Sequence, residues 1–145
     1  MNNASAFEST GLLDRMTAQL RHAGLRPTRQ RVDLGRILFA KGHRHVSAEV
    51  LHAEAETAGV RVSLATVYNT LHQFTEAGLL REIAIDGSRT YFDTNVDDHH
   101  HFFVEGEGRL IDLVGDIGID HLPQAPEGME ITAVEVVIRV RKRRA

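Results

Sequence analysis

Residues 62–80 read VSLATVYNTLHQFTEAGLL, and their pattern predicts one short helix with two different faces. Ser63 is expected to cap the start of this helix, and Gly78 is expected to end it. Apolar side chains recur at helical spacing and form a stripe that packs against a core: Leu64, Val67, Leu71 and Phe74. The outward face carries hydrogen-bonding groups without charge, which suits contacts with base edges in a DNA groove. Its members are Ala65, Thr66, Tyr68, Asn69, Thr70, His72 and Gln73.

Three further helices are expected before this one. Apolar residues between positions 12 and 20 mark the first helix, which stops at Gly24, and residues 1–10 are polar and expected to be disordered. Thr28 is expected to cap the second helix and Ser47 the third. The third helix runs to Gly59. Four helices, separated by turns, are therefore expected between about residue 12 and Gly78.

After Gly78 the pattern becomes that of strands, over residues 79–85 and 88–94, with a tight-turn signal at Asp86-Gly87. Helices followed by a two-stranded hairpin predict a winged helix-turn-helix. In that fold Arg81 and Arg89 on the hairpin can approach the DNA backbone or the minor groove. The alternative is a helical domain with a hairpin and no nucleic acid, which the polar outward face of the fourth helix disfavours.

The charge of the chain is divided between its two ends. The net charge is −3 over 145 residues, but residues 1–90 carry 11 basic against 9 acidic residues and residues 91–145 carry 6 against 11. Residues 21–44 hold seven basic residues and the single acid Asp33, a local excess that suits phosphate contact or, alternatively, a solvated helix. No apolar run is long enough for a membrane span and no signal-peptide pattern is present, so a cytoplasmic protein is expected.

The C-terminal part predicts a small α+β unit. Strands are expected at residues 100–106, 109–115 and 128–142, with a short helix at residues 116–122 before two prolines. A unit of this size is marginal alone, so dimerisation would supply the missing burial. The expected fold is α+β, with a winged-helix domain at residues 1–94 and an α/β dimerisation and metal-sensing domain at residues 95–145.

The nine histidines give the second chemical signal. On a strand, His99 and His101 point to the same face, so their imidazoles can chelate one ion. The chain has no cysteine, which excludes disulfides and thiolate ligands, so a metal must be held by nitrogen and oxygen. Such a set suits Zn(II), Fe(II), Mn(II) or Co(II). If His45 and Asp93 bind the same ion, the metal fixes the angle between the two domains.

Several segments resemble, in order and spacing, the ferric uptake regulator family of metal-sensing repressors. They are AGLRPTRQR, HRHVSAEVLH, VSLATVYNTLHQFTEAGLL, SRTYFDT and DHHHFFVEGEGRLIDL, and they cover nearly the whole chain from about residue 12 to residue 141. The resemblance implies a winged-helix domain, an α/β dimerisation domain and a homodimer that binds an inverted-repeat operator in double-stranded DNA.

The resemblance also assigns roles to individual residues. Tyr68 falls on the base-contacting tyrosine of the family, Asn69 on a place often held by arginine, and Arg26 on a basic residue directed toward the minor groove. The metal site of the family maps onto His45, Asp93, His99 and His101, with aspartate where many members have glutamate. One residue fewer than usual separates Asp93 from His99. A second metal site is not expected, because Val134 stands where one of its ligands would be.

The family commonly holds a Cys-x-x-Cys motif for a structural zinc, whereas Val104 and Glu107 stand there in this chain. Because of the missing cysteines and the HHHFF run, the chain most resembles the iron response regulator branch of the family. That branch is linked to haem and to the control of iron and haem-biosynthesis genes. Without cysteine, histidines would have to hold any haem. The candidates are His43, His45, His99, His100 and His101.

The sequence therefore predicts a dimeric, iron-responsive transcriptional regulator that binds Fe(II), Mn(II) or Zn(II) and possesses no enzymatic activity. The expected DNA contacts are Arg26, Arg31, Ser63, Ala65, Thr66, Tyr68, Asn69 and Arg89. A metal or haem storage or trafficking protein would explain the histidines but not the fourth helix. A metallohydrolase is disfavoured, because the chain has no HExxH motif.

Overall fold

The structure is a computed structural model that describes residues 11, 15–86, 89–97 and 99–144. The chain forms two compact units, one ending at Val96 and the other beginning at Asp97. Residues 1–10, for which disorder was predicted, lie outside the described part of the chain. No described helix is long and apolar enough to cross a membrane.

The first unit begins with helices whose start points follow the predicted caps. A first helical segment at residues 15–22 precedes α2 (Arg29–Phe39), α3 (Ala48–Thr57) and α4 (Leu64–Glu76). The side chains of Thr28, Ser47 and Ser63 each accept a hydrogen bond from a backbone N–H in the first turn of the helix that follows. These bonds satisfy donors that would otherwise have no partner. Helices are present in all four predicted places.

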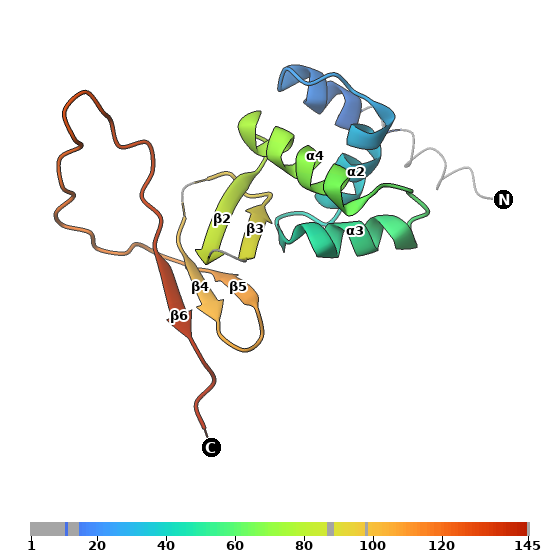
Figure 1. Cartoon of the computed structure of the whole chain (residues 1–145). Coiled ribbons are helices and arrows are strands. Elements are labelled where there is room, and N and C mark those ends of the chain that lie inside the picture. Colours follow the sequence, from blue (N-terminus) through green and yellow to red (C-terminus); the bar gives the residue numbers. More distant parts are fainter. Residues whose placement is uncertain (1–10, 12–14, 87–88, 98, 145) are drawn as a thin grey trace. The chain divides into compact units, whose positions relative to one another are not determined.

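The helices pack around one core, and Figure 1 shows α2, α3 and α4 lying together in the first unit. Gly35 on α2 allows a close approach of the first helix, because a Cβ atom at this position would lie only 2.7 Å from Met16 Sδ. The fully buried side chains come from every helix and from the strands that follow: Leu20, Leu34, Leu38, Val46, Leu51, Val67, Leu71, Phe74 and Phe92. The predicted apolar stripe of α4 therefore faces the core, with Leu64 only partly buried.

A three-stranded antiparallel sheet completes the first unit. It consists of β1 (His45–Val46), β2 (Arg81–Asp86) and β3 (Arg89–Asp93) in the order β1-β3-β2. The hairpin of β2 and β3 follows α4 directly and confirms the predicted wing, although Gly87 and Ser88 at its tip lie outside the described residues. The short strand β1 was not predicted, and its register places His45 opposite Asp93.

The second unit contains a three-stranded mixed sheet. It is formed by β4 (His101–Val104), β5 (Arg109–Asp112) and β6 (Val137–Val140), in the order β5-β4-β6. Strand β5 is antiparallel to β4, and β6 is parallel to it. Phe103 and Leu110 are partners across β4 and β5 and are buried on one face. Because strand residues alternate between faces, Phe102, Ile111 and Ile138 share the opposite face.

Two predictions for the second unit are wrong. Residues 116–122 form no helix, because this short segment follows Gly115 (φ +101°), contains Gly118 and ends at Pro123, so helix nucleation is not compensated. The last strand begins at Val137 rather than near residue 128. Val137 pairs with His101, the first residue of β4, so the residues before it extend beyond the strand that could pair with them.

The positions of the expected cysteines have a different role here. Val104 is buried at the end of β4, and Glu107 lies in the turn before β5. Glu107 forms ion pairs with Lys142 at 2.7 Å and with Arg109 at 3.3 Å, and the hydrogen bond from Lys142, together with its positive charge, lowers the pKa of the Glu107 carboxyl. A surface ion pair therefore connects the β4–β5 turn to Lys142, after the end of β6.

Candidate metal centre and nucleic-acid interface

The first unit contains a buried imidazole and carboxylate pair. His45 Nε2 lies 3.1 Å from Asp93 Oδ2, and the carboxylate is only 1% exposed. The other oxygen of Asp93 accepts a hydrogen bond from the backbone N–H of Asn95 at 2.9 Å. A buried carboxylate is costly unless it is paired, so Asp93 needs partners of this kind. The pair offers one nitrogen and one oxygen ligand.

The residues next to this pair, Arg44 and Thr94, hold it in position through hydrogen bonds. Arg44, directly before His45, donates two hydrogen bonds from Nη2 to the carboxylate of Glu54 on α3, at 2.6 and 2.8 Å. The backbone N–H of Arg44 donates to Thr94 Oγ1 at 2.8 Å, and Thr94 N–H donates to the Arg44 carbonyl at 3.0 Å. Charge-assisted bonds of this geometry are among the stronger ones in proteins. The ends of β1 and β3 are thus fixed against α3.

The second unit contains a second cluster, of two imidazoles and one carboxylate. His99 Nε2 and His101 Nε2 lie 3.2 and 3.3 Å from Asp112 Oδ1, and the two rings are 4.4 Å apart between centroids. His99 Nδ1 is 2.6 Å from the carbonyl of Asp97, so that nitrogen carries the proton and leaves Nε2 as the ligand atom. The cluster offers two nitrogen ligands and one oxygen ligand.

Asp112 was not predicted from the sequence. It lies opposite His101 in the β4–β5 register, and this pairing brings its carboxylate between the two imidazoles. The signal that would have identified it is the position of an acid on the strand that pairs with the histidine strand, which requires knowing the register. His100, a haem candidate, faces away and accepts a hydrogen bond from the Val136 N–H at 3.0 Å. His43 is exposed in the first unit.

The outward face of α4 carries most of the predicted polar residues. Ala65 and Asn69 are exposed, whereas Thr66 and Tyr68 are half-buried. Thr70 was placed on this face, but it is only 4% exposed and donates to the carbonyl of Thr66 at 2.8 Å. The prediction for Thr70 is therefore wrong: its hydroxyl bonds to the preceding helical turn, which allows the side chain to be buried. Ser63 lies at the helix start as its cap.

Tyr68 is held by a carboxylate from the neighbouring helix. Its hydroxyl donates to Glu49 Oε1 on α3 at 2.8 Å. This hydrogen bond to Glu49 raises the pKa of the Tyr68 phenol above 10.0, and desolvation adds to the shift. The ring also stacks on His72, with 6.5 Å between centroids. Tyr68 is thus fixed by contacts with both helices.

Arg31 makes contacts with α4 and with the loop before α2. Its Nε and Nη2 donate to Gln73 Oε1 at 3.2 and 3.0 Å, and Nη1 donates to the Arg26 carbonyl at 2.9 Å. A groove of about 460 Å³ lies here, lined by Arg26, Thr28, Gln30, Arg31, Thr66, Asn69, Thr70 and Gln73. Two basic residues and Asn69 therefore share one groove. Arg89 lies in β3, but its side chain is outside the described part.

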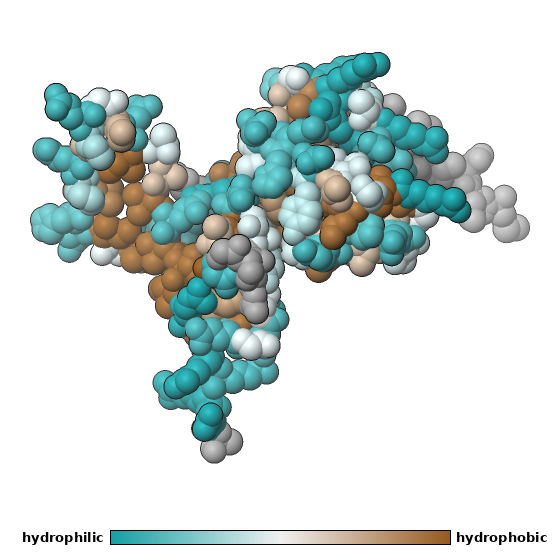
Figure 2. All heavy atoms as spheres, in the orientation of Figure 1, coloured by the Kyte–Doolittle hydropathy of each residue, from teal (hydrophilic) through white to brown (hydrophobic). Residues whose placement is uncertain are grey.

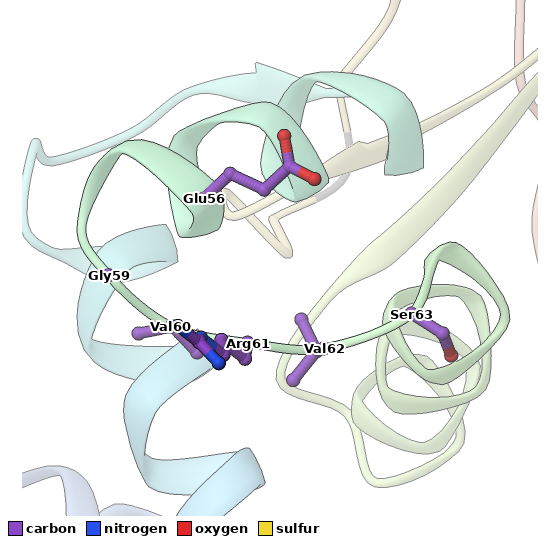
Figure 3. Close-up of a pocket in the computed structure, with 6 residues that line it drawn as sticks. All are labelled: Glu56, Gly59, Val60, Arg61, Val62 and Ser63. Carbon is purple, nitrogen blue, oxygen red and sulfur yellow. The ribbon is translucent and has the colours of Figure 1, made fainter.

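A larger hollow lies along the turn between α3 and α4. It measures about 670 Å³ and is lined by Glu56, Gly59, Val60, Arg61, Val62 and Ser63 (Figure 3). The hydroxyl of Ser63 is already used, because it accepts from Thr66 N and donates to Thr66 Oγ1. This hollow lies along the turn of the helix-turn-helix, and none of its lining residues is a histidine that could bind a metal.

A helical unit with a polar-faced fourth helix and a wing, together with imidazole and carboxylate clusters, defines a winged-helix protein with the ligands for a transition metal. The chain belongs to the Ferric uptake regulator family, whose model matches residues 22–139. It is a metal-responsive transcriptional regulator of that family, whose members are not enzymes, and this confirms the family and the non-enzymatic function predicted above.

Similar proteins are found among both sequences and structures. The chain is 32% identical over 115 residues to the peroxide-responsive repressor PerR of Staphylococcus epidermidis, covering 79% of this chain and 71% of that protein. The solved ferric uptake regulator from Pseudomonas aeruginosa with manganese matches with a TM-score of 0.67 and 29% identity, covering 89% of this chain and 98% of that one. The Vibrio cholerae ferric uptake regulator has a TM-score of 0.67 at 21% identity over 87% and 98% of the two chains, which supports the fold.

Proposed function

We propose that this chain is an iron-responsive regulator whose affinity for operator DNA is set by one divalent ion. The ion is bound by His45 and Asp93 of the first unit together with His99, His101 and Asp112 of the second. The observation that carries the proposal is that each unit holds a cluster of imidazole and carboxylate ligands beside the boundary at Val96 and Asp97.

Neither cluster alone fills every coordination position of such an ion with protein ligands. The first supplies two ligands and the second three, whereas Fe(II), Mn(II) and Zn(II) take four to six from nitrogen and oxygen donors. Asp93 and His99 are only six positions apart, so the clusters are joined by a linker that reaches ~20 Å at most. Because the linker is short, the second cluster is present at a high effective concentration around an ion that the first cluster already holds. One ion bound by both clusters would favour one arrangement of the two units over all others.

The DNA-binding part of the proposal uses α4, with Tyr68 and Asn69 at base edges and Ala65, Thr66 and Ser63 beside them. Arg26, Arg31 and Arg89 are assigned to phosphates or the minor groove. Arg31 keeps this assignment although it binds Gln73, because a guanidinium has five N–H donors and three are used within the chain. Two N–H groups are left for a phosphate.

A second copy of the chain completes the proposal. Among the described residues, eight of the ten exposed large hydrophobic side chains belong to the second unit. In Figure 2, hydrophobic atoms gather on the loop before β6 and at the start of β6. Exposed apolar patches of this kind mark protein interfaces. A homodimer would also present two copies of α4 to an inverted-repeat operator.

The test is the affinity of the full chain for a duplex selected from a random library, measured by fluorescence anisotropy. Protein freed of metal by chelation is compared with protein loaded with Mn(II) or, without oxygen, Fe(II). We expect either ion to tighten binding at least tenfold, a coupling of ~1.4 kcal/mol. Equal affinity with and without metal contradicts the proposed function, and failure to select any duplex supports a storage or trafficking protein instead. Haem added to the metal-loaded protein tests the haem prediction, which the sequence resemblance alone supports.

A peroxide response is a second candidate, favoured by the 32% identity to a protein named as a peroxide-responsive repressor. Peroxide oxidises Fe(II) readily but leaves Mn(II) largely unchanged. In the same binding assay, peroxide should then release DNA from the Fe(II)-loaded protein and leave the Mn(II)-loaded protein bound. If peroxide releases DNA from neither the Fe(II)-loaded nor the Mn(II)-loaded protein, the result supports iron sensing without a peroxide response.

A further inference from the structure

We infer that Glu49 determines base specificity, because it takes the only proton that Tyr68 can donate and leaves the tyrosine as a hydrogen-bond acceptor. At the position that Tyr68 contacts, the protein then selects a base with an amino group, adenine over guanine or cytosine over thymine. The inference rests on the proposed DNA-binding function and adds the kind of base edge that this site accepts.

The contact that fixes the proton joins two helices. Glu49 lies in the first turn of α3, and its carboxylate accepts the Tyr68 hydroxyl of α4 at 2.8 Å. A hydrogen bond to an ionised acceptor is roughly twice as strong as one between neutral groups. The stacked ring of His72 restricts the tyrosine from the side of α4. The direction of the O–H bond is therefore set before any DNA is bound.

A phenol has one proton and lone pairs on the same oxygen. With the proton directed at Glu49, only the lone pairs remain for a base. In the major groove, adenine N6 and cytosine N4 are donors, whereas guanine O6 and thymine O4 are acceptors at the equivalent places. An acceptor opposite guanine O6 or thymine O4 leaves two lone-pair groups facing each other without a proton. Glu49, which is itself only an acceptor, disfavours those two edges further.

Base preference is the measurement that tests this inference. Operators are selected from a random duplex library with the wild-type chain, and each position is then replaced in turn. The position contacted by Tyr68 is the one at which Tyr68→Phe loses its preference. We expect the wild type to prefer adenine or cytosine there by about threefold to tenfold, the range of one net hydrogen bond. Replacing adenine by purine, which lacks the amino group, should cost the same factor.

Glu49→Ala is the decisive variant, because it removes the acceptor on α3 and so frees the phenol proton for a base. It should reduce the preference for the amino-bearing base to less than twofold. Glu56→Ala removes the same side chain from the same helix without contacting Tyr68, and it should keep the wild-type preference. The inference is overturned if Glu49→Ala keeps that preference, if Tyr68→Phe changes no position, or if the wild type prefers guanine or thymine at this place. Failure to select any duplex instead overturns the proposed function, and the inference with it.

Discussion

The key residues of this chain are carboxylates that each face a hydrogen-bond donor from another element or strand. Asp93 faces His45, Asp112 faces two histidines, and Glu49 faces Tyr68. Removing one partner of such a pair leaves the other with an unsatisfied polar group. A single substitution should therefore destabilise the protein more than the loss of side-chain volume alone would. These pairs can be tested one at a time, without DNA.

The first prediction concerns the titration of Tyr68. Glu49 raises the pKa of this phenol, so the bond stabilises the fold below pH 10.0 and the stabilisation is lost as the pH rises through the raised pKa. The other titratable group beside the ring is His72, whose ring centroid lies 6.5 Å from that of Tyr68. Ultraviolet absorbance should show Tyr68 ionising above the ordinary tyrosine pKa, and at the ordinary value in Glu49→Gln. Subtracting the spectrum of Tyr68→Phe removes the signal of Tyr91, and identical curves for the wild type and Glu49→Gln would contradict the contact.

The second prediction concerns Asp112 as a metal ligand. Asp112→Asn keeps the shape of the side chain but removes the charge and one strong oxygen donor. Losing partners outside the ligand shell costs ~10- to 100-fold in metal affinity, so losing a ligand should weaken Mn(II) binding at least tenfold. Competition with a chelating dye measures this directly. Asp116→Asn, an exposed acid nearby, should bind Mn(II) as the wild type does. Equal affinity of both variants would remove Asp112 from the site.

The elements of the first unit are set by local signals that short-range reasoning can find. Ser47 and Ser63 cap their helices, and Gly78 with φ +82° ends α4, as the sequence predicted. The same reasoning could not find β1 or Asp112, because both depend on pairing with a strand distant in sequence. Thr70 was misplaced because helical spacing does not show that a hydroxyl can bond to its own helix and be buried.

The second unit was predicted less well than the first. The apolar pattern after Gly128 continues for a full strand length, but only the residues from Val137 onward have a partner in β4. A periodic pattern can show where a strand is possible, whereas the length of the neighbouring strand decides where it begins. Of the five residues proposed as ligands, four were predicted from the sequence, and the fifth required the sheet register.

The third prediction concerns the cap of α4. Ser63 Oγ accepts from Thr66 N at 3.1 Å, so Ser63→Ala should lower the free energy of unfolding by ~1 kcal/mol and the melting temperature by a few degrees. Ser63→Gly is the matched control, since glycine at a cap costs only a few tenths of that amount. Circular dichroism on heating measures both variants. Equal stability of the alanine variant and the wild type would show that the cap contributes nothing.

For the whole molecule, the exposed apolar face of the second sheet is the feature that requires a partner. Ile111 and Ile138 flank Phe102 on this face and are 38% and 37% exposed. The described core of the second unit contains few large buried side chains, namely Phe103, Val104 and Leu110. A unit with so small a core gains stability when a second copy covers its apolar face.

The fourth prediction follows from that face. Ile138→Asp places a charge where the second copy is expected to pack, so light scattering should show a particle of half the wild-type mass. Val50→Asp introduces the same charge at an exposed position on α3, and it should keep the wild-type mass. A wild-type mass for Ile138→Asp would show that the dimer uses another surface.

In the proposed function, metal and operator DNA bind to one coupled molecule. The most direct measurement is the Mn(II) affinity of the full chain, by competition with a dye, in the absence and in the presence of saturating operator. Linkage requires that DNA tighten Mn(II) binding by the same factor as Mn(II) tightens DNA binding. We predict equal factors of at least tenfold in both directions. An Mn(II) affinity that operator DNA leaves unchanged would contradict the account, because the metal would then bind without any effect on the DNA-binding state.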